Sequence, residues 1–366
     1  MSRVDDHPGG SATKILLLTD NLRIGGVQQV VVRLAGELLK RGFRVGIAAS
    51  AEGDLWRSVP PGCSVHHLPP GRGVHAALKR LVALRKLIRN DGFEILHGHQ
   101  RGITLTARVA LVGLPAVLVE HVHNIFLPVS KKRVSFRGAY LIACGSAVET
   151  MLLNDYKRRA QNIYRILNGV PDLSKAYATE RDPSINPTRI IAVGRTSEQK
   201  NPFKFIDVIE SLTAQGCVVY AEWVGSGELL EDCRAEVIKR GISNVVFSGA
   251  SINVADKLRN SDLLLMTSEW EGLPLAVLEA MSLGLGVILP DVGSCRDAVR
   301  NGHNGLLYSP NESPDRIAIS IAEAINCGAL PDWGQASRLR YLDSFTIERM
   351  TDEIEKVYKV AAEDLG

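Results

Sequence analysis

The chain has 366 residues, and because a domain contains roughly 100 to 200 residues, this length predicts two domains. An apolar content of 45% with 23% charged residues is that of a folded protein, which excludes disorder as the dominant state. The 43 lysines and arginines against 40 aspartates and glutamates leave a net charge of +3, too small for a nonspecific nucleic-acid binder, so no nucleic-acid partner is expected.

The cysteines and the first residues indicate a reducing, cytoplasmic location. None of the six cysteines belongs to a C-x-x-C pair, so we expect buried thiols and neither a disulfide framework nor a zinc site. Residues 1–12 contain two acids and no apolar run, which predicts a flexible start and no signal peptide.

Short apolar runs alternate with helical segments in the first half of the chain. Buried strands are predicted at 14–20, 44–50, 94–100, 116–121 and 139–146, with a helix at 27–38 between the first two. This alternation predicts a parallel sheet covered on both faces. Residues 102–119 approach the length of a membrane span, but Arg108 and Pro115 interrupt them, so we interpret them as a buried helix and a buried strand.

The pattern breaks at 172–189, a polar segment with two prolines that is typical of a linker. A second series of strands is predicted at 188–196, 217–227, 244–250, 262–268 and 286–292. The sequence therefore predicts an α/β protein with two tandem doubly wound domains, 1–171 and 190–345. Residues 346–366 have a helical period and are expected to return to the first domain.

Two glycine-rich turns follow predicted strands. Gly25 and Gly26 lie between a strand and a helix, where backbone N–H groups can approach a phosphate; a tight turn without a ligand is the alternative. Gly225 and Gly227 match the dinucleotide fingerprint only in part, because Leu230 occupies the third glycine position. No G-x-x-x-x-G-K-[ST] sequence is present, which argues against a P-loop NTPase.

Charged residues follow two predicted strands of the second domain. Arg195 and Lys200 lie at the carboxyl edge of the sheet, where open α/β sheets bind ligands, and they suit a diphosphate. Glu271 and Glu279 are eight residues apart, and carboxylates accept hydrogen bonds from sugar hydroxyl groups. The alternatives are a helix cap for Glu271 and solvated surface charges for the others.

Five motifs carry a resemblance to a known family. They are the first-loop glycine pair, ILNGVP at 166–171, VGRTSEQKNP from 193, EGLPLAVLEAMSLG from 271 and VGSCRDAVRNGHNGLLY at 292–308. In this order and spacing the sequence resembles family 4 of the retaining glycosyltransferases over nearly its whole length. The resemblance implies the GT-B fold, two Rossmann-like domains with a cleft between them, and a hexosyltransferase that uses a nucleotide-diphosphate sugar.

The resemblance also implies roles for individual residues. Arg195 and Lys200 are expected to bind the leaving diphosphate, Glu271 the transferred sugar and Glu279 the ribose. The other residues expected at the donor site are Gly25, Gly26, Gly272, Leu273 and Phe247. Retention in this family needs no protein nucleophile. Because no D-x-D sequence is present, we expect transfer without a metal and without a cofactor.

Histidines end two strands of the first domain. The resemblance implies a histidine that contacts the donor sugar, which we assign to His123 of EHVHN, with His121 as the alternative because side chains two apart on a strand share a face. His99 of HGHQ and Asn124 are expected on the acceptor side. A purely structural histidine is the competing interpretation.

Two features leave alternatives open. Asp297 stands where the family usually has glutamate, so the contact made there is uncertain from sequence. Basic residues on a helix at 79–89 and at 131–137 predict contact with an anionic membrane surface, which would suit a lipid-linked acceptor; an ordinary amphipathic helix is the alternative.

The predicted function is therefore transfer of a sugar to a glycan or lipid-linked acceptor in polysaccharide or lipopolysaccharide synthesis, by a cytoplasmic protein peripheral to the inner face of the plasma membrane. A nucleotide-sugar epimerase of the same fold and a noncatalytic sugar-nucleotide-binding protein are the alternatives. The sequence does not identify the nucleotide base, the sugar or the acceptor.

Overall fold

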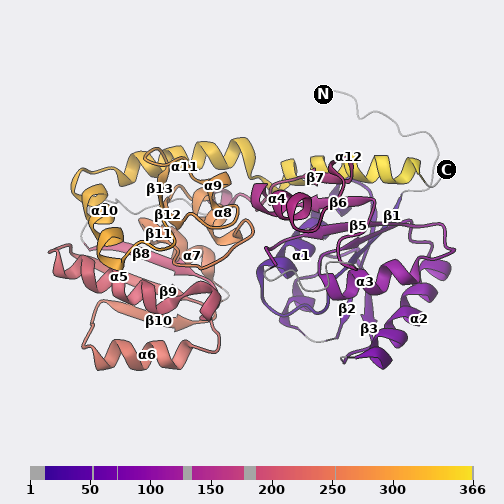
Figure 1. Ribbon diagram of the computed structural model, residues 1–366, viewed down its shortest axis with the longest axis horizontal. Helices are drawn as coiled ribbons and strands as arrows, with labels where there is room; N and C mark the ends of the chain where they lie inside the picture. Colours follow the sequence, from indigo (N-terminus) through magenta and orange to yellow (C-terminus); the bar gives the residue numbers. More distant parts are fainter. Residues whose placement is uncertain are drawn as a thin grey trace.

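The computed structural model describes residues 13–51, 53–71, 73–126, 134–176, 187–251 and 253–364. Within these ranges the chain forms two α/β domains that lie side by side along the long axis of the molecule (Figure 1). Each domain contains one sheet, and every strand pair in both sheets is parallel. The predicted fold class is confirmed.

The first domain is built on a seven-stranded sheet of order β3-β2-β1-β4-β5-β6-β7. Its strands are β1 (Lys14–Leu18), β2 (Arg44–Ser50), β3 (Ser64–Leu68), β4 (Ile95–Gly98), β5 (Val117–Val122), β6 (Tyr140–Ala143) and β7 (Ile163–Arg165). Its helices are α1 (Gly26–Lys40), α2 (Val74–Asp91), α3 (Arg101–Ala110) and α4 (Ser146–Asn154), with short 3-10 turns η1 (Asp54–Ser58) and η2 (Ala160–Asn162). The strand order reverses between β1 and β4, and such a switch point opens a ligand site at the carboxyl ends.

The second domain repeats this plan with a six-stranded sheet of order β10-β9-β8-β11-β12-β13. Its strands are β8 (Thr188–Val193), β9 (Val219–Val224), β10 (Val245–Gly249), β11 (Leu263–Leu265), β12 (Gly286–Pro290) and β13 (Gly305–Tyr308). Its helices are α5 (Pro202–Ala214), α6 (Leu230–Lys239), α7 (Val254–Arg259), α8 (Leu275–Ser282), α9 (Cys295–Ala298), α10 (Pro314–Asn326) and α11 (Leu330–Ser344), with 3-10 turns η3 (Leu173–Ala176) and η4 (Glu198–Lys200). Here the switch point lies between β8 and β11.

The sequence pattern explains why the central elements form. In α1, Val30, Val31, Leu34 and Leu38 form a fully buried stripe, because they recur at helical spacing. The interrupted apolar stretch at 102–119 becomes α3 and the start of β5, as predicted. Among the described residues, no helix combines the length and apolar character that crossing a bilayer requires.

Three edge strands escaped prediction: β3 and β7 in the first sheet and the half-buried β13 in the second. Strand β3 is mostly exposed or half-buried, and β7 has no buried residue, so neither contains the apolar run that identifies a central strand. β3 and β7 lie at the two outer edges of the first sheet, so each pairs with a neighbouring strand on one side only.

The last helix, α12 (Ile347–Glu363), leaves the second domain and packs on α1, β4 and β5 of the first (yellow in Figure 1). Where it does so, Val170 of the outgoing segment forms a parallel bridge with Thr346 of the returning one. The Val170 N–H donates to the carbonyl of Phe345 at 3.0 Å, and the Ile347 N–H donates to the carbonyl of Val170 at 3.1 Å. The two segments that pass between the domains are therefore bonded to each other.

The hydrophobic core crosses the boundary between the domains. One cluster of buried apolar side chains includes Ile15 of β1 and Val119 of β5 together with Leu264 of β11, Leu278 of α8 and Val287 of β12. Burial of apolar surface on both sides of the boundary stabilises this relative placement of the sheets.

Candidate active site

The loop that carries Lys200 is fixed at the carboxyl end of β8. It runs from Gly194 through η4 to Asn201, which has a left-handed backbone (φ 46°) and whose side chain caps α5 by accepting from the Lys204 N–H at 3.2 Å. The Thr267 hydroxyl, just beyond β11, donates to the carbonyl groups of Lys200 (3.0 Å) and Asn201 (2.9 Å). The loop is thus held to the neighbouring strand.

The glycines of VGSGELL support the same loop. A methyl group added at Gly225 would overlap the carbonyl oxygen of Gly194, and one added at Gly227 would overlap that of Thr196. The partial likeness to a dinucleotide fingerprint therefore reflects close backbone packing of one loop on another.

Lys200 and Glu271 form an ion pair between this loop and the segment after β11. The Lys200 ammonium donates to Oε1 of Glu271, and the two side chains are only 19% and 7% exposed. Neither is a solvated surface charge. Glu271 does not cap the next helix either, because the N-cap of α8 is Pro274. Arg195, by contrast, is exposed at the start of the loop.

Glu279 joins the two domains. It is buried on α8 and accepts a hydrogen bond from Arg33 of α1 at 2.6 Å, so it does not lie on a solvated face. Gly25 is the N-cap of α1, and Gly26 opens that helix opposite the start of α8, where an added methyl group would lie 3.8 Å from Leu275 Cδ1. We refer to Arg195, Lys200, Glu271 and Glu279 as the charged group.

The segment after Glu271 touches the first domain directly. A methyl group added at Gly272 would overlap the carbonyl oxygen of His123, and the side chain of Asn168 donates to the carbonyl of Leu273 at 2.8 Å. Gly272, Leu273 and His123 thus meet at the boundary.

Four histidines gather where β4 and β5 of the first domain end, and within the described part of the chain only His123 is seen to contact the second domain. We refer to His97, His99, His121 and His123 as the histidine group. Because β4 and β5 are neighbours and each pair is two residues apart, all four rings lie on one face of the sheet. The ring centroids of His121 and His123 are 4.0 Å apart, and those of His97 and His99 are 4.2 Å apart. His99 Nδ1 lies 3.0 Å from His123 Nε2, so the two histidines of the prediction contact each other.

Burial keeps the histidine group uncharged. Loss of solvent lowers the pKa of His97 to about 3, and it lowers that of His123 to about 3 against the opposing effect of Asn168. It also lowers the pKa values of His99 and His121 well below their usual range, and the neighbouring imidazoles add to the effect. All four imidazoles are neutral at pH 7.

Two predicted residues do not join these groups. Phe247 is buried in the core of the second domain, where its ring stacks on Trp223 with centroids 5.8 Å apart, so its side chain does not fit the expected role at the donor site. Although β10 is an edge strand, this ring packs into the core of its domain. Asn124 lies near His123, but its side chain accepts from the Ile125 N–H at 2.9 Å and thereby shapes its own turn.

Several contacts were not predicted from the sequence. Asp297 Oδ2 accepts from the Ser146 N–H at 2.6 Å, so the shorter acid binds the start of α4 in the opposite domain. Nothing in the sequence indicated that Arg33 contacts Glu279, because Arg33 is only one of several polar residues on an amphipathic helix. Asn168 lay within the quoted ILNGVP motif, but its contact with Leu273 depends on the packing of the two domains.

Comparison with known proteins identifies the class. The family model described as glycosyl transferases group 1 matches residues 179–340, and the model described as Glycosyltransferase Family 4 matches residues 24–172. Together the two models cover both domains. The chain belongs to the group 1 glycosyltransferases of family 4 type, which have the GT-B fold.

Curated relatives agree with this class, and solved structures agree with this fold. A UDP-Gal:alpha-D-GlcNAc-diphosphoundecaprenol alpha-1,3-galactosyltransferase from Escherichia coli is 25% identical over 311 residues, 77% of this chain and 79% of that protein. The O-antigen biosynthesis glycosyltransferase WbnH from Escherichia coli is 24% identical over 308 residues, 79% of this chain and 84% of that protein. A glycosyltransferase from Rickettsia africae superposes with a TM-score of 0.84 at 17% identity, over 97% of this chain and 100% of that one. HepE from Anabaena, solved with UDP and glucose, gives 0.79 at 20% identity, over 95% and 99%.

Proposed function

We propose that the protein is a retaining glycosyltransferase that moves a sugar from a nucleoside-diphosphate sugar to a glycan or lipid-linked acceptor during synthesis of cell-surface polysaccharide or lipopolysaccharide. The names of the Escherichia coli relatives support this acceptor class and pathway. The complexes of HepE with UDP and glucose support a nucleotide-sugar donor.

The observation that carries the proposal is the ion pair between Lys200 and Glu271 at the boundary of the domains. Without a donor, each charge satisfies the other in a mostly buried place. A diphosphate is more strongly anionic than one carboxylate and takes Lys200, together with the exposed Arg195, as its partners. Glu271 is then released to accept hydrogen bonds from the hydroxyl groups of the sugar.

The chemistry that follows relies on placement and electrostatics. Lys200 and Arg195 neutralise the charge that develops on the leaving diphosphate, so the transfer step needs no bridging metal. Glu271 and the neighbouring His123 hold the sugar between them. The acceptor attacks the face from which the diphosphate departs, and a diphosphate oxygen takes its proton, so no covalent sugar–protein intermediate forms.

A binding experiment tests the site first. UDP-, GDP- and ADP-sugars are screened by thermal shift, beginning with UDP-galactose and UDP-glucose, because a ligand at 100 times its Kd stabilises the fold by about 2.7 kcal/mol. One donor is expected to raise the Tm of the wild type and of Glu222→Gln, which breaks a similar lysine–glutamate pair (Lys257 and Glu222) elsewhere in the second domain. Lys200→Ala is expected to lose the shift. Equal shifts in Lys200→Ala and the wild type would contradict the proposed site.

A turnover experiment then separates the candidate functions. The identified donor is incubated with a synthetic GlcNAc-diphospholipid, and the product is examined by proton NMR of the anomeric centre. Release of the nucleoside diphosphate with retained configuration supports the proposal. An inverted product refutes retention, an epimerised sugar nucleotide without transfer favours the epimerase, and binding without any conversion across a panel of acceptors favours a noncatalytic binder.

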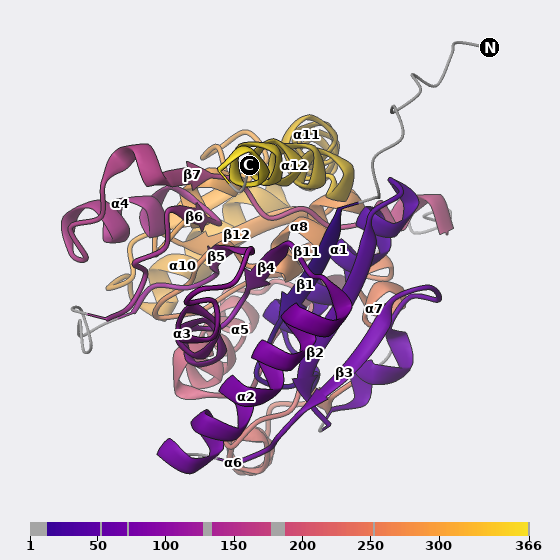
Figure 2. The ribbon, with the colours of Figure 1, turned by 90° about the vertical axis from the view of Figure 1, so that its right-hand side faces the viewer.

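We also propose that α2 docks on an anionic membrane surface. The helix exposes Val74 (77%), Leu78 (55%) and Val82 (65%) at intervals of four residues, which places them in one stripe on the outside of the first domain (Figure 2). Lys79 and Lys86 are exposed on the same helix. Apolar side chains flanked by cations suit the interface of an anionic bilayer, where a lipid-linked acceptor would be found. The predicted basic residues Lys131, Lys132 and Arg133 lie outside the described residues.

A further inference from the structure

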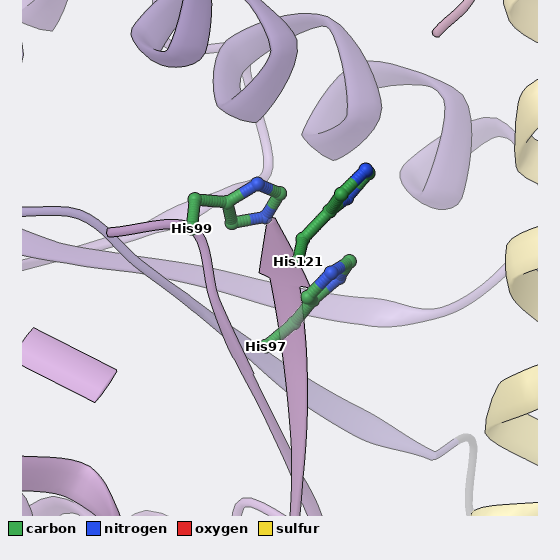
Figure 3. A group of neighbouring side chains, drawn as sticks. All are labelled: His97, His99 and His121. Carbon is green, nitrogen blue, oxygen red and sulfur yellow. The ribbon is translucent and has the colours of Figure 1, made fainter. Parts of the chain in front are cut away.

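Three members of the histidine group have the composition and spacing of a metal site. His97, His99 and His121 each offer one ring nitrogen, and these three nitrogens lie within 4.8 Å of one another (Figure 3). Their side chains are at most 4% exposed. His97 and His121 have no part in the proposed transfer, so that reaction does not account for them.

The hydrogen bonds of these rings are incomplete. Among the described residues, Nε2 of His97, Nε2 of His99 and both ring nitrogens of His121 are buried without a partner. An unsatisfied buried polar group costs about 1–3 kcal/mol. One such atom on each of the three rings, gathered in one place, indicates a common partner that binds nitrogen lone pairs.

The ring nitrogens that do have hydrogen-bond partners are the Nδ1 atoms, which would not bind the metal. His97 Nδ1 lies 2.6 Å from the hydroxyl of Tyr358 on α12, and His99 Nδ1 lies 3.0 Å from His123 Nε2. With the protons on these two Nδ1 atoms, each Nε2 presents a lone pair. Metal-binding histidines nearly always have their second nitrogen held in this way.

The sheet explains how the three rings converge. His97 and His99 project from one face of β4, and the β4–β5 register pairs Gly98 with Glu120, so His99 and His121 come next to each other. Nearby Glu120 alternates to the opposite face, where its carboxylate accepts from the Gly138 N–H at 2.6 Å. The set is therefore purely imidazole, which suits zinc among the common metals.

We propose that His97, His99 and His121 bind one zinc ion between β4 and β5. Ligands on zinc bonds of about 2.0–2.1 Å at tetrahedral angles lie about 3.3 Å apart. Binding therefore draws together nitrogens that now lie up to 4.8 Å apart and turns the nearly parallel rings of His97 and His121 (interplanar angle 5°) toward the ion. A solvent molecule completes the coordination. The ion lies within the first domain and is not a partner of the diphosphate, so the site is independent of the proposed transfer mechanism.

Metal binding by the full-length protein tests the site without an activity measurement. The protein is stripped with a chelator and titrated with zinc chloride in competition with a chromophoric chelator. The wild type is expected to bind one equivalent, whereas His121→Phe, which keeps an aromatic ring in the stack, is expected to bind none. His303→Asn removes an exposed histidine elsewhere and is expected to behave as the wild type.

A second variant and a second probe guard against loss of folding in His121→Phe. Tyr358→Phe removes the partner of His97 and is expected to keep the stoichiometry but weaken zinc binding about 10- to 100-fold. Cobalt(II) is expected to give the visible absorption of a tetrahedral site in the wild type. Less than a tenth of an equivalent in the wild type, unchanged zinc affinity in Tyr358→Phe, or unchanged binding by folded His121→Phe would overturn the proposal.

Discussion

The two domains meet in surfaces of opposite character, although each is formed by the carboxyl ends of a parallel sheet. The second domain presents the charged group, in which Lys200 is paired with Glu271 and Glu279 with Arg33. The first domain presents the histidine group, which is neutral because it is buried. One fold thus supplies two different environments. The proposed donor also has two characters, because its diphosphate is anionic and suits the charged group, whereas its sugar is uncharged.

The largest expected effect comes from removing the cation of the charged group. Lys200→Ala is expected to reduce kcat/KM about 10²- to 10³-fold, because a group that stabilises transition-state charge is lost. It also leaves Glu271 buried without its partner. The double variant Lys200→Ala/Glu271→Gln is therefore expected to recover part of the lost Tm but none of the lost activity. Activity that recovers along with the Tm would mean that the pair is structural.

The contact between the two surfaces can be broken at Gly272. Gly272→Ala places a methyl group against the carbonyl oxygen of His123 and is expected to cost about 1–3 kcal/mol of stability. Chemical denaturation measures this change in the free energy of unfolding. Gly36→Ala in the middle of α1 is the control, and it is expected to be neutral or stabilising because its methyl group meets only the Pro60 ring, at 3.4 Å. Equal effects of the two substitutions would show that the surfaces are not in contact.

A smaller effect is expected for the ion pair between α1 and α8. Arg33→Met is expected to destabilise the protein by about 1–2 kcal/mol, between the values for exposed and buried pairs, because the two side chains are 22% and 10% exposed. A double-mutant cycle with Glu279→Gln isolates the interaction. A coupling energy of zero would show that the Arg33–Glu279 pair does not stabilise the contact between the domains.

The smallest effect tests the outer surface of the first domain. Lys86→Ala on α2 is expected to weaken partitioning onto vesicles of anionic lipid about fivefold, since each cation near such a surface contributes about 1 kcal/mol. Vesicle sedimentation measures the fraction of protein bound, with zwitterionic vesicles as the reference. The control is Lys239→Ala on α6 of the second domain. If both variants bind like the wild type, α2 is an ordinary covering helix.

The fold was predictable wherever a strand is buried on both faces. Strands such as β1 and β12 are continuous apolar runs, whereas the edge strands β3 and β7 are not, so the sequence contains no local signal for them. Phe247 was misplaced for a related reason: the sequence alone does not show whether an aromatic residue on a strand faces the core or a ligand.

Single residues of the candidate site could be selected from the sequence, but the contacts between them could not. Lys200 and Glu271 stood out through motif and position, yet their pairing depends on how the loop after β8 folds against the segment after β11. The two histidine motifs were each visible in the sequence. Their convergence was not, because it is set by the register of β4 on β5.

The bridge between Val170 and Thr346 has a mechanical consequence. Both connections between the domains pass through this one joint, so any motion that separated the domains would turn about it. Separation then grows with distance from the joint, and it is greatest at the tips near α6 and α2, far from the crossing in Figure 1.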